Sequence, residues 1–389
     1  MITAEEFEIL RSEEVQQLIE QNKDRDPLQI ALNRRIPHAR LVADQVKYRK
    51  RATHKLPRYA AAGCILPSLA FEQSSSELCA AQKPLRGTSV LDLTCGLGVD
   101  SSFLSAHFDR VVSLERNGLL AQIARENFRR LGLKNIEVIH SSSEDYLASC
   151  HTHFDWIYAD PDRRGADGRK KVCLEDCSPN MIALMPRLKE LANGICIKNS
   201  PLFDVEEAFR LFPSCRVEVI SIGDECKEVV IYIDPQEPSE HLVEAIAIGK
   251  GCYRSSYFAP VPPRPEAFRA SEYRYLILPD VALLKARKAR ESLAAKADIW
   301  SENGFGFALE KPTDCLGRIF RIERIMRYDP KALKRQFKGH KAQIFKRDCP
   351  ISNEEVMARL GLRAGAELSL AITKIEDQTV LIVLGEELV

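Results

Sequence analysis

The sequence predicts an α/β protein built on a doubly wound parallel sheet, with a helical region before the sheet and an α+β region after it. Three observations lead to this fold class. Between Thr88 and Asp234, short β-rich runs alternate with helical stretches, the pattern of strands joined by crossover helices. The residues before this stretch have helical periodicity, and those after residue 317 mix strands with helices.

The N-terminal region begins as a helix. Residues 3–22 have amphipathic helical spacing, and this segment ends at a breaker that includes Pro27. Further helices are expected up to about Ala80. The central region then supplies strands at 89–93, 110–114, 136–140, 154–159, 194–198, 216–222 and 228–234. The helices between them are expected at 101–106, 119–131, 179–191 and 205–212.

Two proline-containing segments, 234–240 and 259–265, place at least one domain boundary between residues 235 and 270. Beyond it we expect a strand at 275–278, a basic helix at 281–297, strands at 318–326, 342–346, 367–373 and 379–384, and helices at 330–337 and 353–360. We therefore expect four regions: a helical domain (1–83), the α/β domain (84–235), a linker with a further segment (236–316), and a terminal α+β domain (317–389).

The overall composition is that of a globular protein. The chain of 389 residues is 45% apolar and 29% charged. It contains no apolar run of about 18 residues and no signal-peptide pattern, so we expect a cytoplasmic protein without a membrane partner. The twelve cysteines include no Cys-x-x-Cys pair, so neither a disulfide scaffold nor a bound metal ion is expected.

The net charge of +1 conceals two basic segments. Between Arg34 and Arg58, nine Lys or Arg residues face one acid, Asp44: they are residues 34, 35, 40, 47, 49, 50, 51, 55 and 58. Between Arg318 and Arg347, eleven face two acids: they are residues 318, 321, 324, 327, 331, 334, 335, 338, 341, 346 and 347. Such density attracts phosphate backbones irrespective of their sequence, although a solvated helix face explains either segment alone. Together they favour a nucleic-acid partner over a small molecule.

A candidate nucleotide site follows the first expected strand, where Asp92 leads into a turn containing Gly96 and Gly98. Glycine lets a backbone approach a ligand closely, but the third glycine of a dinucleotide fingerprint is replaced by Ser101. Asp92 can attract a positively charged ligand group. Glu115 ends the second strand, where its two oxygens can accept both ribose hydroxyls.

Over about residues 85–234, the chain resembles the class I S-adenosylmethionine-dependent methyltransferases, which have a Rossmann-like sheet. The resemblance depends on Asp92-Leu93-Thr94-Cys95-Gly96-Leu97-Gly98, on Glu115 and on Asp160-Pro161-Asp162. It implies that S-adenosylmethionine is the cofactor. The cofactor-binding residues that it implies are Asp92, Thr94, Cys95, Gly96, Gly98, Glu115, Arg116, Ser142, Ser143 and Asp160.

Two positions depart from the family pattern. Thr94 stands where glycine is common, which suggests a backbone with negative φ and a hydroxyl that can touch the ligand. Ser142 stands where an aspartate usually binds the adenine amino group, so either Glu144 or Asp145 is left as its replacement.

The segment after the fourth strand points to the acceptor. It reads Asp160-Pro161-Asp162-Arg163-Arg164, without the aromatic that stacks on a base in the family's amino-nitrogen enzymes and without a Pro-Cys pair for a covalent mechanism. Direct in-line transfer is therefore expected, with Asp160 or Asp162 accepting hydrogen bonds or a proton. Arg163 and Arg164 either bind phosphate groups of the substrate or are solvent-facing or ion-paired residues. Lys198 is a third catalytic candidate, which either steers phosphate into the site or has a structural role.

The whole chain is similar to a bacterial family of methyltransferases with a ferredoxin-like segment and a C-terminal THUMP-like domain. The similarity lies in residues 71–76, 158–164, 198–204 and 275–280. It implies an RNA substrate, tRNA or rRNA, and assigns the ferredoxin-like segment to 236–316 and the THUMP-like domain to 317–389. A small-molecule or protein methyltransferase and a catalytically inactive RNA-binding module are the alternative functions.

Overall fold

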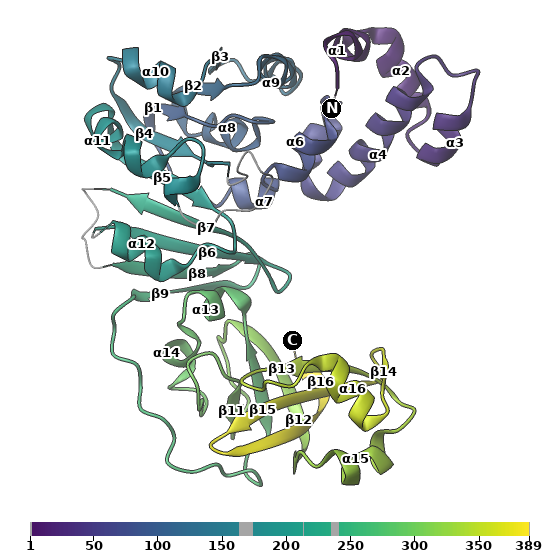
Figure 1. Cartoon of the computed structure of the whole chain (residues 1–389), viewed down its shortest axis with the longest axis vertical. Coiled ribbons are helices and arrows are strands. Elements are labelled where there is room, and N and C mark those ends of the chain that lie inside the picture. The colour runs from purple at the N-terminus through teal and green to yellow at the C-terminus, as the bar shows by residue number, and fades with distance from the viewer. Residues whose placement is uncertain (1, 163–173, 213, 235–240, 389) are drawn as a thin grey trace. The chain divides into compact units, whose positions relative to one another are not determined.

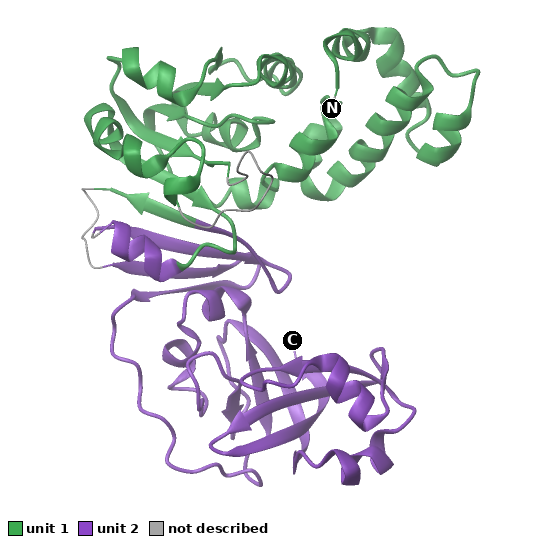
Figure 2. Ribbon diagram, in the orientation of Figure 1, with its two compact units in different colours: residues 1–204, 230–238 green, residues 205–229, 239–389 purple. Residues whose placement is uncertain are grey.

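A computed structural model describes residues 2–162, 174–212, 214–234 and 241–388. The chain forms two compact units, one of residues 1–204 and 230–238 and the other of residues 205–229 and 239–389 (Figure 2). The elements are labelled in Figure 1. No helix among the described residues is long and apolar enough to cross a membrane.

The first unit begins with seven helices: α1 (Ala4–Arg11), α2 (Glu13–Gln21), α3 (Pro27–Leu32), α4 (Ala39–Lys55), α5 (Pro57–Ala61), α6 (Ser68–Gln73) and α7 (Glu77–Ala80). The amphipathic segment predicted at 3–22 is interrupted. Ser12 has extended backbone angles and its side chain accepts a hydrogen bond from the Val15 amide, so it ends α1 and caps α2.

A sheet whose first five strands are parallel follows these helices. Its strands are β1 (Gly87–Asp92), β2 (Phe108–Glu115), β3 (Ile136–His140), β4 (Phe154–Ala159), β5 (Ala192–Asn199) and β7 (Glu225–Ile233). They lie in the order β3-β2-β1-β4-β5-β7, and the pairs β1-β2, β1-β4, β2-β3 and β4-β5 are parallel. The connecting helices are α8 (Val99–Leu104), α9 (Gly118–Arg130), α10 (Ser143–Ser149) and α11 (Met181–Leu191), with a 3₁₀ turn at Leu174–Asp176. The predicted doubly wound sheet is confirmed.

The N-terminal helices and the sheet region share a hydrophobic core. Leu97, Val99 and Ile123 pack in the same buried cluster as apolar side chains of α1 to α6. The Asn127 side chain, fully buried on α9, exchanges two hydrogen bonds with the backbone of Ile65, at 2.8 and 3.0 Å.

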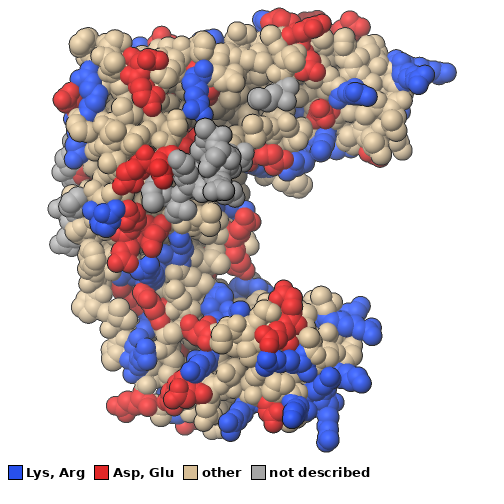
Figure 3. Space-filling model, in the orientation of Figure 1, with Lys and Arg blue, Asp and Glu red and all other residues tan. Residues whose placement is uncertain are grey.

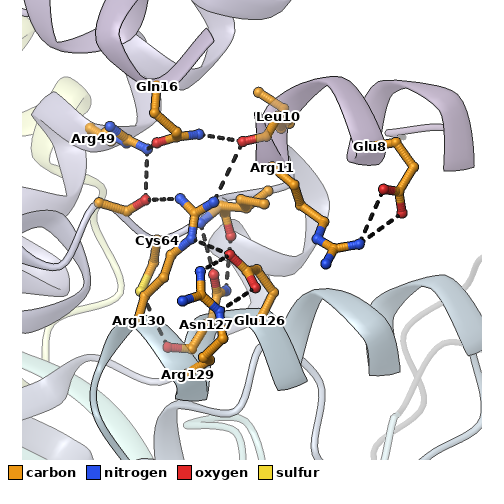
Figure 4. Close-up of polar contacts among 12 residues, drawn as sticks. Glu8, Leu10, Arg11, Gln16, Arg49, Cys64, Glu126, Asn127, Arg129 and Arg130 are labelled. Carbon is orange, nitrogen blue, oxygen red and sulfur yellow. Dashed lines mark hydrogen bonds and ion pairs between the residues drawn. The ribbon is translucent and has the colours of Figure 1, made fainter. Parts of the chain in front are cut away.

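Arginines complete this docking, as Figure 4 shows. The Gly63 carbonyl oxygen accepts hydrogen bonds from Arg49 on α4 at 2.6 Å and from Arg130 on α9 at 2.5 Å. Arg130 is itself held by Glu126 at 2.7 Å. Residues 1–83 therefore pack as an integral layer of the first unit.

The second unit contains two sheet portions. The first portion has the strand order β7-β6-β8-β9. Its strands besides β7 are β6 (Arg216–Ile222), β8 (Leu242–Ala247) and β9 (Gly251–Ser256), and it is preceded by α12 (Val205–Leu211). No strand was predicted for β8 and β9, which lie between the two proline-containing segments. The other sheet has the order β11-β10-β12-β16-β15-β13-β14.

The strands of that second sheet are β10 (Tyr275–Pro279), β11 (Gly306–Ala308), β12 (Gly317–Arg327), β13 (Lys341–Lys346), β14 (Arg363–Ala364), β15 (Leu368–Ile375) and β16 (Gln378–Leu388). Its helices are α13 (Val281–Lys285), α14 (Ala289–Leu293), α15 (Pro330–Phe337) and α16 (Asn353–Leu360). The single helix predicted at 281–297 is wrong, because Arg287 has a left-handed backbone with φ of 57° and separates α13 from α14. The predicted α+β character of the C-terminal region is confirmed.

Candidate functional site

The carboxyl ends of β1, β2, β4 and β5 meet at one edge of the sheet because these neighbouring strands are parallel. Asp92, Glu115 and Asn199 are the last residues of β1, β2 and β5, and Asp160 directly follows β4. The sheet thus gathers the polar residues that the sequence places at separate strand ends.

Asp92 is buried at this edge, with 1% of its surface exposed. Its Oδ1 accepts a hydrogen bond from the Thr94 amide at 2.9 Å, and its Oδ2 accepts one from the Ser101 hydroxyl. Ser101 in turn lies 2.8 Å from the Ser113 hydroxyl. These partners fix the carboxyl group at the start of the glycine-containing loop.

Burial raises the pKa of Asp92 from 3.8 to about 7, and the nearby charges of Asp100 and Asp160 act in the same direction. The hydrogen bonds from Ser101 and Thr94 oppose this shift only in part. Asp92 is therefore poised to change its protonation near neutral pH, and a cationic ligand beside it favours its ionised form.

The loop between β1 and α8 presents an open backbone at Gly96. This residue has a left-handed φ of 56°, and a Cβ placed on it would find only the Thr94 carbonyl oxygen within 4 Å, at 3.9 Å. Gly98 has a different role, because a Cβ there would collide with the Phe128 ring. The Cys95 side chain is buried in a core cluster with Phe128, so this residue offers a ligand its backbone rather than its thiol.

Glu115 closes the same loop from β2. Its Oε2 accepts a hydrogen bond from the Gly96 amide at 2.9 Å, and its Oε1 accepts one from the Asn117 amide at 2.8 Å. The neighbouring Arg116 donates to the Ser178 hydroxyl at 3.0 Å and lies 3.5 Å from the Asp162 carboxylate. A ribose at this position would share Glu115 with two backbone amides.

Thr94 joins the first and fourth strand ends. Its hydroxyl oxygen accepts a hydrogen bond from the Asp160 amide at 2.7 Å and lies 3.4 Å from the Asp92 carboxylate. A glycine could not make this connection. The side chain at the unusual position therefore binds the two loops together.

The third strand end is organised by serines. Ser143 is buried and donates to the Leu93 carbonyl at 2.8 Å. Ser142 caps α10 by accepting from the Asp145 amide at 3.1 Å, and its hydroxyl donates to the Asp145 carboxylate at 2.6 Å. Asp145 is thus engaged in the cap, while Glu144 is exposed beside it.

Asp160 and Lys198 form an ion pair of 2.5 Å at the ends of β4 and β5. The Asp160 side chain is 32% exposed, whereas that of Lys198 is 10% exposed. Lys198 also donates to the Ser75 hydroxyl at 3.0 Å, and Ser75 donates to Asp100 at 2.7 Å. Sequence reasoning did not assign a role to Ser75 or Asp100, although Ser75 belongs to the segment 71–76 used for the family resemblance.

The predicted substrate-binding pair, Arg163 and Arg164, lies outside the described residues. Asp162 is described, and its backbone exchanges hydrogen bonds with Ser178 at 2.8 and 2.9 Å. Direct hydrogen bonds thus join Asp92, Thr94 and Asp160 in one set and Gly96 and Glu115 in another, and ion pairs link Arg116 to Asp162 and Lys198 to Asp160.

The chain is similar to known methyltransferases in sequence and to one family model at its C-terminal region. The family model described as THUMP domain-like matches residues 317–386. An uncharacterized S-adenosylmethionine-dependent methyltransferase of Mycobacterium tuberculosis strain H37Rv is 23% identical over 84% of this chain and 90% of its own length. The 23S rRNA (uracil(1939)-C(5))-methyltransferase of Klebsiella pneumoniae is 35% identical over 25% of this chain and 21% of its own.

A crystal structure from Porphyromonas gingivalis W83, provisionally described as a methyltransferase, is similar over the full chain. It has a TM-score of 0.83 and 26% sequence identity, and the match covers 99% of this chain and 100% of that one. The architecture described above is therefore also found in an experimentally determined structure.

Proposed function

We propose that this chain, whose residues 317–386 match a THUMP domain-like family model, is an S-adenosylmethionine-dependent methyltransferase that methylates RNA by direct transfer of the methyl group. The observation that carries the proposal is the chain of hydrogen bonds from Asp92 through Thr94 to Asp160. These bonds hold Asp92, which would bind the cationic cofactor, close to Asp160, which would contact the methyl acceptor, at one edge of the sheet.

The residues present fit S-adenosylmethionine. The open backbone at Gly96 provides space for close approach, and the donor set around it is acidic, as a sulfonium and an ammonium group require. Asp92 would hold the methionyl part, and Glu115 would accept from ribose hydroxyls. Ser142 and Ser143 border the region in which the adenine would lie, with Glu144 as the exposed acid next to them.

When bound, the cofactor supplies an electrophilic methyl group. Asp160 accepts a hydrogen bond from the N–H or O–H of the acceptor and so orients its lone pair toward that methyl. The acceptor would receive the methyl group that the bound cofactor supplies, and it would lose its proton to Asp160, Asp162 or solvent. Lys198 holds Asp160 in place, and Arg163 and Arg164 are proposed to bind phosphate.

The C-terminal region supports RNA as the acceptor. Seven exposed basic residues follow one another along β12 and α15: Arg321, Arg324, Arg327, Lys331, Lys334, Arg335 and Lys338. Within the described residues, none of the seven is ion-paired to a carboxylate. Figure 3 shows basic side chains over this part of the molecule. Unpaired surface cations of this density suit a phosphate backbone. The rRNA-methylating relative supports the same acceptor class.

Transfer of label from methyl-labelled S-adenosylmethionine tests the proposal. The purified chain is incubated with RNA, protein and metabolite fractions from cells that lack the gene. Label is expected in tRNA or rRNA, and mass spectrometry of the nucleosides then identifies the methylated base. Label in protein or metabolites alone would indicate the other enzymatic function, and absence of S-adenosylhomocysteine binding by calorimetry would indicate an inactive RNA-binding module.

The two arginines have a test of their own. Arg163→Ala combined with Arg164→Ala is expected to raise the KM for RNA about tenfold or more, because two phosphate contacts are lost, while S-adenosylhomocysteine affinity stays unchanged. Unaltered KM and turnover in this double variant would show that the arginines do not contact the substrate.

A further inference from the structure

A cluster of buried charged groups lies behind the proposed methyl-transfer site. Lys83 and Asp100 form an ion pair of 2.9 Å, with side-chain exposures of 1% and 11%. Lys83 also donates to the Cys79 carbonyl at 3.3 Å. Through Ser75, Asp100 is connected to Lys198, which reaches Asp160 at the rim.

The members of this cluster come from separate parts of the chain. Lys83 precedes β1, and Asp100 lies in the first turn of α8. Ser75 lies in the short connection between α6 and α7, so it belongs to the N-terminal helical region. Lys198 is on β5. Four different elements or connections therefore contribute to one polar path that ends at Asp160.

The charges of the cluster are electrostatically linked. Burial acts to raise the pKa of Asp100, but the ammonium groups of Lys83 and Lys198 and the hydrogen bonds from Ser75 and Lys83 outweigh it and lower this pKa to about 2. Removing one partner from a buried ionic group leaves an uncompensated charge, which makes such groups strongly interdependent. Asp100 is thus a fixed negative charge near Lys198.

We propose that Ser75, Asp100 and Lys83 are positioning residues that hold the Lys198 ammonium against Asp160, and so keep Asp160 ionised and correctly oriented toward the methyl acceptor. This inference rests on the proposed function for its catalytic consequence. Ser75 accepts a hydrogen bond from Lys198 while donating to Asp100, so its hydroxyl determines where the ammonium lies. The Asp160 side chain is 32% exposed at the rim of the sheet.

The other charged groups near this path are already engaged. Asp92 is hydrogen-bonded to Thr94 and Ser101, and Arg116 pairs with Asp162. Lys198 contacts Asp160 directly, at 2.5 Å. A change in the position of Lys198 should therefore act on Asp160.

Ser75→Ala tests the positioning role, and the adjacent Ser74→Ala is its matched control because Ser74 donates only to the Phe71 carbonyl. With labelled S-adenosylmethionine and bulk RNA from cells lacking the gene, Ser75→Ala is expected to lower kcat about tenfold. The KM for the cofactor should change less than about twofold. The acidic limb of the kcat profile should move to higher pH, because the ammonium that favours the Asp160 carboxylate is less well held. Ser75→Thr, which keeps the hydroxyl, should restore the profile.

A second measurement needs no substrate. In protein labelled with ¹³C at lysine Cε, the Lys198 resonance is assigned by its loss in Lys198→Arg, and its titration midpoint is compared between variants. The midpoint is expected to fall in Asp100→Asn and in Ser75→Ala, since an anion or a hydrogen-bond acceptor is lost, and to stay unchanged in Ser74→Ala. If Asp100→Asn does not fold, Ser75→Ala supplies the same comparison.

Two results would overturn the positioning role: a kcat profile of Ser75→Ala that superimposes on that of the wild type, or a Lys198 midpoint that is unmoved in the folded variants. These results differ from failure of the proposed function. In that case the wild type transfers no methyl group to RNA, and the lysine titration still decides whether the cluster sets the state of Lys198.

Discussion

At the scale of single residues, Asp92 combines two demands that oppose each other. Its burial at the end of β1 disfavours a negative charge, whereas a cationic cofactor needs that charge. With a pKa of about 7 in place of 3.8, its ionisation at neutral pH costs the folded state ~4 kcal/mol. The loop thus gives up stability at the position where the ligand would restore it.

The stability of the protein should therefore respond to pH through Asp92. Because its folded-state pKa is raised, the penalty is absent below about pH 4, grows as pH rises from about 4 to 7, and is constant above. Asp92→Asn should be more stable than the wild type at pH 7.5, by ~2–4 kcal/mol, with a smaller difference at pH 4.5. Urea unfolding at both pH values measures this. An equal difference at both would contradict the role of ionisation.

Cofactor binding should show the complementary dependence. S-adenosylhomocysteine carries an ammonium group, so its affinity should increase as pH rises through about 7 and Asp92 loses its proton. Below that value, the affinity of the wild type should fall by up to about tenfold for each pH unit. Isothermal titration calorimetry of Asp92→Asn should show weak binding without this pH dependence, and a retained dependence would assign it to another group.

At the scale of elements, the contacts between α9 and the N-terminal helices hold two sequence-distant regions together. Asn127 is fully buried and bonded to both polar groups of the Ile65 backbone. Its loss leaves a buried amide and a buried carbonyl without a partner. Arg129, on the same helix, has an exposed side chain whose partner among the described residues is Glu126.

Asn127→Ala is expected to destabilise the first unit by ~2–4 kcal/mol, because two buried backbone groups lose their partner. Arg129→Ala should change stability by less than about 1 kcal/mol, because the Arg129 side chain is exposed and Glu126 keeps its ion pair with Arg130. Thermal unfolding measures both, and limited proteolysis shows whether residues 1–83 are released earlier. Equal effects of the two substitutions would argue against the docking role of Asn127.

The sequence predicts elements better than it predicts their interruptions and contacts. The sequence pattern places β3, β4, β6, α15 and α16 at their observed bounds. It does not separate α13 from α14, since the break at Arg287 is a backbone angle and not a change in pattern. The role of Ser75 could not be predicted either. It is the middle one of three consecutive serines, and it differs from the others only because the fold brings Lys198 and Asp100 to its hydroxyl.

At the scale of the whole molecule, the strand ends could be predicted because parallel strands carry their carboxyl ends to one edge. Asp92, Glu115 and Asp160 follow from that rule alone. The packing of the N-terminal helices against the sheet region could not be predicted from this rule. Their cluster with Leu97 and Val99 depends on surface complementarity between regions far apart in sequence, which periodicity does not report.

The basic surface of β12 and α15 should control RNA affinity. On α15, Leu333 and Phe337 are buried, whereas Lys331 and Lys334 are exposed. Lys331→Glu with Lys334→Glu should weaken RNA binding at least about tenfold and reduce the slope of log affinity against log salt by about 1–2, because counterion release is lost. Lys374→Glu is the control, since Lys374 is paired with Asp377. Gel-shift titrations at several salt concentrations measure this, and equal losses in both variants would contradict a localised site.

The position of Ser75 early in the chain also bears on how the protein is made. Chains generally begin to fold from the N-terminus during synthesis. The helices that emerge first find the partners of Gly63 and Ile65 only when α9 has been synthesised, and Ser75 meets Lys198 only when β5 has been completed. We expect that ribosome-bound chains ending before residue 198 leave the segment around Ser75 sensitive to protease. Protection of the helices that pack on α9 should arise when α9 has left the exit tunnel, and protection of the segment around Ser75 when β5 has left it.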